Sequence, residues 1–150
     1  MRFVLLGLFA LIAAAIVFVR LAQVSAEPYH RAAEAQPVGD YTQVGRFLAV
    51  REVSAPPAQA LAAIERVALA TPRTALVAGS VDAGMMTFRT TSRLWAFPDF
   101  TTVSIIDGND AAPARVMIDG RLHYGQADLG VNKARVTGWL AQLHDVIAAP

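Results

Sequence analysis

The stretch Gly-Gln-Ala-Asp-Leu-Gly-Val-Asn-Lys-Ala-Arg, at residues 125–135, separates an apolar strand-like run from an amphipathic helical run. Glycine, aspartate and asparagine are the residue types that form tight turns, and Asn132 is a good N-cap residue. We therefore predict a tight connection from the last strand of the domain to its last helix. Turn and helix-cap roles are assigned to Gly125, Asp128, Gly130, Asn132 and Arg135.

Apolar periodicity on either side of this turn predicts strands at residues 47–53, 75–81, 85–95, 101–106 and 115–124. It also predicts one helix that begins near Pro57 and a second over residues 133–148, each with an apolar stripe. Short turns favour antiparallel pairing, and Asp119-Gly120 indicates a β-bulge in the last strand. The expected fold class is α+β: a two-layer domain of about five mostly antiparallel strands with two helices on one face, in the order β-α-β-β-β-β-α.

The N-terminal run from Phe3 to Val19 contains no charged residue. About 17 apolar residues lie at the lower limit for a helix that crosses a ~30 Å hydrocarbon core. We therefore predict an N-terminal transmembrane helix, and favour this uncleaved anchor over the alternative of a cleaved signal peptide. The predicted division is a membrane anchor (or signal peptide) at residues 1–22, a linker or lead-in at 23–44, and the α+β domain at 45–150.

This anchor sets the expected location of the protein. A short tail followed at once by an apolar run resembles a secretory signal-anchor. The expectation is a single-pass protein of the inner (plasma) membrane in a bacterial cell envelope, with an extracytoplasmic, periplasmic globular domain. Membrane lipid is then a partner through the N-terminal segment.

Composition excludes several classes of function. The 150-residue chain has a net charge of +1 and a single lysine, Lys133, so no nucleic acid is expected as a partner. The absence of cysteine excludes disulfides, thiolate metal sites and a cysteine nucleophile. The chain also lacks a histidine-rich metal motif, a Gly-rich phosphate loop and a G-x-S-x-G motif. We therefore expect no metal, no cofactor and no catalytic residues.

Arginines give the better functional signal. Arg89 and Arg93 are four residues apart in a predicted strand, so their side chains should project from one face of the sheet. If the strand that carries Arg121 and His123 pairs nearby, this face holds several cationic groups. Guanidinium groups bind carboxylate and phosphate groups through paired hydrogen bonds. The alternative is an ordinary solvated face whose arginines pair with Asp99, Asp119 or Asp128.

Residues 88–99 and 125–135 together resemble the bacterial domain-of-unknown-function 1499 family. The matching positions are Phe97, Asp99, Gly125, Asp128, Gly130, Asn132 and Arg135. Leu122, His123 and Ala127 depart from the serine, arginine and serine usual in the family, so a basic contact there becomes protonation-dependent through His123. The resemblance covers about residues 47–143. It implies an anchored protein with a Tyr29-His30 pair in its lead-in, and no reaction.

The expected function is non-catalytic: a membrane-anchored cell-envelope protein that binds an anionic small ligand or a lipid head group. The candidate ligand-binding residues are Arg89, Arg93, Arg121 and His123. One alternative is a structural protein–protein interaction module of the envelope, which an exposed apolar patch around Trp95 would favour. A second alternative is an enzyme that uses His123 and Asp128 as an acid/base pair.

Overall fold

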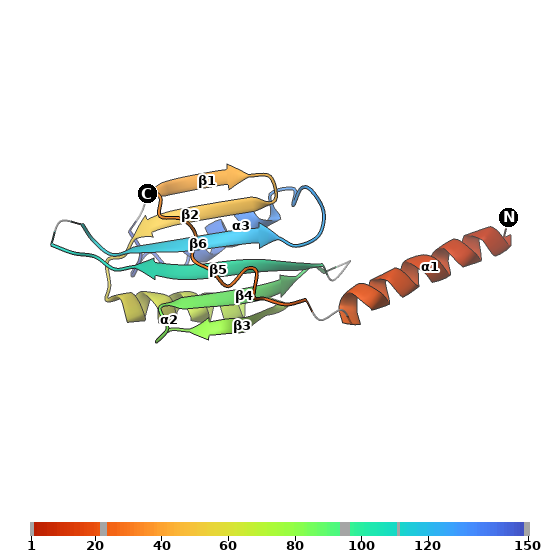
Figure 1. The fold of residues 1–150 in the computed structure, drawn as a ribbon, viewed down its shortest axis with the longest axis horizontal. Coiled ribbons are helices and arrows are strands. Elements are labelled where there is room, and N and C mark those ends of the chain that lie inside the picture. The colour runs from red at the N-terminus through yellow and green to blue at the C-terminus, as the bar shows by residue number, and fades with distance from the viewer. Residues whose placement is uncertain (1, 22–23, 94–96, 111, 149–150) are drawn as a thin grey trace.

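The computed structural model describes residues 2–21, 24–93, 97–110 and 112–148. Six antiparallel strands form one sheet in the order β1-β2-β6-β5-β4-β3 (Figure 1). Their bounds are β1 (Gly39–Gln43), β2 (Arg46–Glu52), β3 (Thr74–Ser80), β4 (Met85–Thr91), β5 (Pro98–Ile106) and β6 (Arg115–Leu122). The chain crosses from β2 to the opposite edge of the sheet and then returns strand by strand, so β6 closes the gap beside β2.

The sheet has six strands, so the prediction of about five is wrong. The additional strand, β1, lies within residues 23–44, which the sequence assigned to a linker or lead-in. Its residues Asp40-Tyr41-Thr42-Gln43 lack the apolar alternation of a half-buried strand. It forms because a two-residue turn, with Gly45 at a φ of 68°, brings it back along β2.

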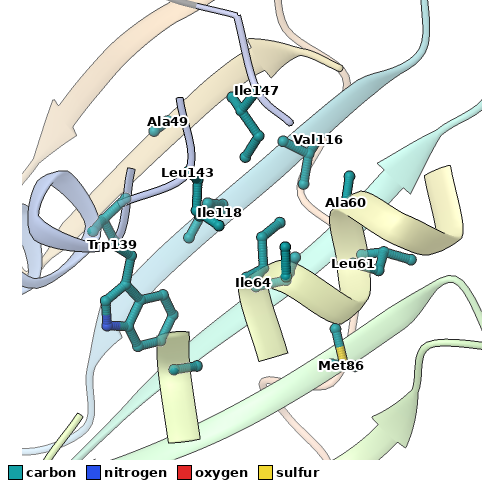
Figure 2. Close-up of a cluster of buried hydrophobic side chains, with 14 of the residues drawn as sticks. Ala49, Ala60, Leu61, Ile64, Met86, Val116, Ile118, Trp139, Leu143 and Ile147 are labelled. Carbon is teal, nitrogen blue, oxygen red and sulfur yellow. The ribbon is translucent and has the colours of Figure 1, made fainter. Parts of the chain in front are cut away.

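Helices α2 (Pro57–Ala70) and α3 (Val131–Leu140) cover one face of the sheet, as the periodicity predicted (Figure 1). Figure 2 shows the apolar cluster between these helices and the sheet. The buried stripe of α2 includes Leu61 and Ile64. The last helix is shorter than expected, because the chain leaves the helix after Leu140 and Ile147 pairs with Val53 at the end of β2.

The N-terminal helix, α1, spans Arg2–Leu21. In the part of the chain that the structure describes, no helix is both long enough and apolar enough to cross a membrane. The prediction of a transmembrane helix is therefore wrong. The apolar run between Arg2 and Arg20 is shorter than the roughly 20 residues of a typical span, so a length at the lower limit was not sufficient evidence for one.

Residues 24–38, here called the strap, cross the sheet face opposite the helices (Figure 1). Side chains of the sheet hold the strap through its backbone: Thr102 and Arg121 donate to the Tyr29 carbonyl at 2.7 Å each, and Arg115 donates to the Gln36 carbonyl at 2.9 Å. The face on which the sequence analysis placed a ligand-binding surface is therefore largely covered.

Candidate functional site

The sheet register aligns Arg89, Phe100, Arg121 and Arg46 in one row across β4, β5, β6 and β2. Residues directly opposite each other in antiparallel strands project to the same face. That face lies under the strap, because Tyr29 stacks on Phe100 with ring centroids 4.2 Å apart. The expectation that Arg89 and Arg121 share a face is thus correct, and Arg46 joins them. We call these four residues the arginine row.

Arg93 does not belong to this row. Strand β4 ends at Thr91, and Arg93 lies in an exposed turn beyond it. The strand ends there because the Ser92 N–H donates to the Phe97 carbonyl and the Phe97 N–H donates to the Ser92 hydroxyl. The alternation that linked Arg93 to Arg89 therefore does not apply. Trp95, on which the interaction-module alternative depended, lies outside the described residues.

One buried carboxylate serves two arginines of the row. Asp119 accepts from Nε and Nη2 of Arg46, at 2.8 and 3.1 Å, and its Oδ2 lies 3.2 Å from Nε of Arg121. Burial lowers the pKa of Arg121, and the neighbouring charges of Arg46 and Arg31 act in the same direction, while Asp119 opposes them. Two guanidinium groups around one carboxylate leave a positive charge in excess, which favours an added anion.

Arg121 forms its hydrogen bonds mainly with the strap. Its Nη2 donates to the Tyr29 carbonyl at 2.7 Å and approaches the Arg31 carbonyl and the Thr102 hydroxyl at 3.3 Å. Its side chain is only 14% exposed, so it has little surface left for a ligand. Arg89 is half-buried and forms no ion pair with any residue the structure describes.

His123 lies in an aromatic cluster under the strap. Its Nδ1 is 2.6 Å from the Tyr29 hydroxyl, and its ring meets those of Phe100 and Tyr124 edge-on. Burial lowers the pKa of His123, although Asp99 opposes the shift. Burial raises the pKa of Tyr29, although Arg121 opposes it. Both shifts favour a neutral imidazole and a protonated phenol, which share a hydrogen bond.

The N-terminus of α3, at the turn of residues 125–135, is capped by a residue other than the one predicted. Gly130, at a φ of 81°, stands at the N-cap of α3, and Asn132 lies inside the helix with no exposed surface. The Asp128 carboxylate accepts from the N–H groups of Asn132 at 2.9 Å and Gly130 at 3.2 Å. Burial would raise the pKa of Asp128, but these backbone donors outweigh it and the net shift is downward. Gly125 has a φ of 97°, as expected for a turn glycine.

Arg135 ties the first turn of α3 to the start of β5. Its Nη1 donates to Asn132 Oδ1 at 2.7 Å and its Nη2 to Asp99 Oδ2 at 3.0 Å. Burial raises the pKa of Asp99, although the bonds from Arg135 oppose this. These bonds fix the start of α3 against β5, and the residues that make them are Asp99, Asp128, Asn132 and Arg135.

Gly120 marks a close approach of Asn132 and not a bulge. Strand β6 pairs without interruption with β2 and β5 over Asp119 and Gly120, so the predicted bulge is absent there. A Cβ atom at Gly120 would lie 3.1 Å from the Cβ of Asn132. The register shift lies in β3, between Leu76 and Ala78.

His123 and Asp128 have separate partners. His123 contacts Tyr29, while the carboxylate of Asp128 accepts from the backbone of α3. Over the described ranges, the structure shows no bond joining the two side chains, which the acid/base alternative would require. It also shows no cluster of three His, Cys, Asp or Glu residues there that could hold a metal ion.

A small cleft, which no sequence pattern predicted, opens between the strap and the β1–β2 hairpin. Its volume is about 220 Å³, and its lining residues are Glu34, Gln36, Tyr41, Gln43, Arg46 and Leu48. Prediction from sequence missed it because both of its walls lie partly within residues 23–44, where no element was expected.

Comparison with known protein families gives a match. The profile of a family described as "Protein of unknown function (DUF1499)" matches residues 21–143. No curated protein matches the chain. The matched range begins before the strap and ends beyond α3, so it includes the sheet, both covering helices and the strap. Because the match spans well over half of the sequence, the chain belongs to the DUF1499 family, as its turn motif indicated.

Proposed function

We propose that this domain is a non-catalytic binding module that recognises an anionic group of a small ligand or a lipid head group. One observation carries the proposal: the arginine row holds three guanidinium groups, and Asp119 is the carboxylate that pairs with it. A row with excess positive charge favours an anionic partner, and guanidinium groups bind carboxylates and phosphates through two parallel hydrogen bonds.

The three arginines contribute differently. Arg121 holds the strap and contributes positive charge beneath it. Because its hydrogen bonds are made within the protein, it is not proposed as a ligand contact. Arg46, whose side chain is one-third exposed, and Arg89, which is half-buried, lie at the two ends of the row, and each is proposed as a separate contact for an anionic group. Three strand spacings, or about 14 Å, separate them. His123 is proposed to support the strap rather than the ligand. The location in the cell envelope stays a prediction from the sequence.

The test is a thermal-shift titration of the full chain with inorganic phosphate and with acetate. A ligand that binds only the folded state raises the melting temperature in proportion to the logarithm of its concentration, once this exceeds Kd. We expect at least one anion to raise the melting temperature of the unaltered chain. The rise should be smaller for Arg89→Gln, and also for Gln43→Glu, which places a carboxylate beside Arg46.

The matched control is Arg66→Gln, which removes one positive charge from an exposed position on α2, away from the strap. This variant should respond to the anions as the unaltered chain does. If neither anion raises the melting temperature, or if Arg66→Gln weakens the response as much as the variants of the row, the proposal is wrong.

A further inference from the structure

The cleft between the strap and the β1–β2 hairpin is small and polar, with an apolar floor. The strap supplies Glu34 and Gln36, and the hairpin supplies Tyr41, Gln43, Arg46 and Leu48. Its volume of about 220 Å³ is below the roughly 300–1,000 Å³ of sites for drug-sized ligands. Leu48 is almost fully buried and forms the floor. A ligand of this cleft is therefore a small polar molecule.

One end of the cleft is cationic. Gln43 stands directly opposite Arg46 in the register of the hairpin. Arg46 uses Nε and Nη2 for Asp119, and within the described part of the chain no acceptor contacts its Nη1. Because Arg46 and Arg121 share one carboxylate, this end keeps a positive charge in excess. It favours an anionic group that can accept from Nη1 of Arg46.

The cleft is also lined by a carboxylate, from the strap, and an aromatic ring, from β1, which favour a cation. Tyr41 pairs with Leu48, two residues further from the hairpin turn than the Gln43–Arg46 pair, so the two pairs are about 7 Å apart along the strands. The Tyr41 hydroxyl donates to the Pro37 carbonyl, which fixes the aromatic ring beside the cleft. Glu34 is exposed and has no ion pair among the described residues. A carboxylate and an aromatic ring together favour an ammonium group.

We infer that this cleft binds a small zwitterion, with its anionic group on Arg46 and its ammonium group beside Glu34 and Tyr41. The inference rests on the proposed function, because Arg46 belongs to the arginine row, and it adds the cationic half of the ligand. Glu34 also repels a molecule that carries only negative charge, so the cleft selects by charge pattern as well as by size.

The experiment is a calorimetric titration of the full chain with probes matched in length. The probes are 4-aminobutyrate, which carries both charges, butyrate, which carries the anion alone, and butylamine, which carries the cation alone. We expect 4-aminobutyrate to bind at least about fivefold more tightly than either of the others. Glu34→Gln should weaken 4-aminobutyrate by about fivefold and leave butyrate unchanged or improved.

Two further variants locate the binding. Gln43→Glu adds a carboxylate beside Arg46 without disturbing Asp119, and it should weaken both 4-aminobutyrate and butyrate. Glu27→Gln removes another exposed strap carboxylate that does not line the cleft, and it should change neither affinity. Both positions are exposed, so neither substitution should impair folding.

The outcomes separate this inference from the proposed function. If butyrate binds as tightly as 4-aminobutyrate and Glu34→Gln has no effect, the zwitterion inference is overturned while anion recognition stands. If phosphate binds but none of the three probes does, the cleft is not the site. If neither phosphate nor any of these probes binds, both proposals fail.

Discussion

Both faces of the sheet are covered, but by different kinds of interaction. On the helix face, α2 and α3 bury an apolar cluster in which Trp139, Phe88 and Ile64 are almost fully enclosed. On the strap face, a segment with neither helix nor strand covers buried polar groups such as Thr102 and Asp119, which are hydrogen-bonded or ion-paired. Apolar burial is non-directional, whereas polar cover depends on the geometry of each bond.

The difference assigns separate roles to the two faces. The helix face supplies most of the stability, because hydrophobic burial is the dominant favourable term in folding. The strap face holds its cover through a few donors, among which Arg121 and Thr102 share one carbonyl of the strap. Loss of one such donor should release the strap locally, whereas loss of a core side chain should weaken the whole domain.

The largest expected effect is on the helix face. Trp139→Ala should lower the free energy of unfolding by about 3–5 kcal/mol, because a large buried side chain leaves a cavity. The substitution also removes the edge contact with Phe88 and the 2.8 Å hydrogen bond from Nε1 to the Thr71 hydroxyl. Equilibrium unfolding in urea measures this change.

Leu69→Ala is the control, because Leu69 lies on α2 with 48% of its surface exposed. Its effect should stay within about 0.5 kcal/mol. A loss below about 1 kcal/mol for Trp139→Ala would contradict the view that this face carries the stability.

A smaller and more local effect is expected on the strap face. Arg121→Met should cost about 1–3 kcal/mol, because Asp119 loses one of the two arginines that surround it and the Tyr29 carbonyl loses one of its two side-chain donors among the described residues. Hydrogen exchange should also accelerate at the amides of residues 24–38 more than in β4 and β5. The second measurement is needed because a global loss alone would not distinguish the strap from the core.

Arg66→Met is the matched control, since Arg66 is exposed on α2. It should change neither the free energy of unfolding nor the exchange of the strap. Uniform acceleration throughout the sheet in Arg121→Met would show that the strap and the core unfold together, and that the two faces do not have separate roles.

The same contrast explains which elements could be predicted from sequence. The helix face was predictable because its side chains recur at helical or strand spacing, as Leu61 and Ile64 do on α2. Strand β1 was not, since an edge strand held by backbone pairing needs no apolar alternation. The end of α3 was misplaced for a related reason: Leu143 and Ile147 are buried as their pattern indicated, but outside the helix. An apolar stripe in the sequence therefore predicts which residues are buried, but not whether the backbone there is helical.

The candidate site was predictable only in part. Strand alternation and pairing placed Arg89 and Arg121 on one face. The strap was not predictable, because Tyr29 and His123 are 94 residues apart and their contact follows no periodic pattern. Gly120 illustrates the remaining ambiguity, since a glycine in a strand indicates either a bulge or a close approach. The structure shows the close approach of Asn132.

The smallest expected effect is a pH dependence that arises on the strap face. Burial lowers the pKa of His123 in the folded protein below its ordinary value of 6.5. As the pH falls below 6.5, the unfolded chain therefore binds a proton before the folded protein does. The contribution of His123 to stability is complete above this value, and it is lost as the pH falls toward the folded pKa.

Urea unfolding at about pH 7.5 and pH 5.5 tests this sign. The unaltered chain should lose more stability on acidification than His123→Gln, in which position 123 no longer titrates. His144→Gln is the control, because the His144 side chain is 77% exposed, and it should match the unaltered chain. Burial raises the pKa of Asp99, so Asp99 acts with the opposite sign at lower pH. Its contribution largely cancels when the unaltered chain is compared with His123→Gln. Equal losses in these two proteins would mean that the neutral imidazole does not stabilise the strap. The stacking of Tyr29 on Phe100 and the bonds to the Tyr29 carbonyl would then hold the strap without the bond to His123.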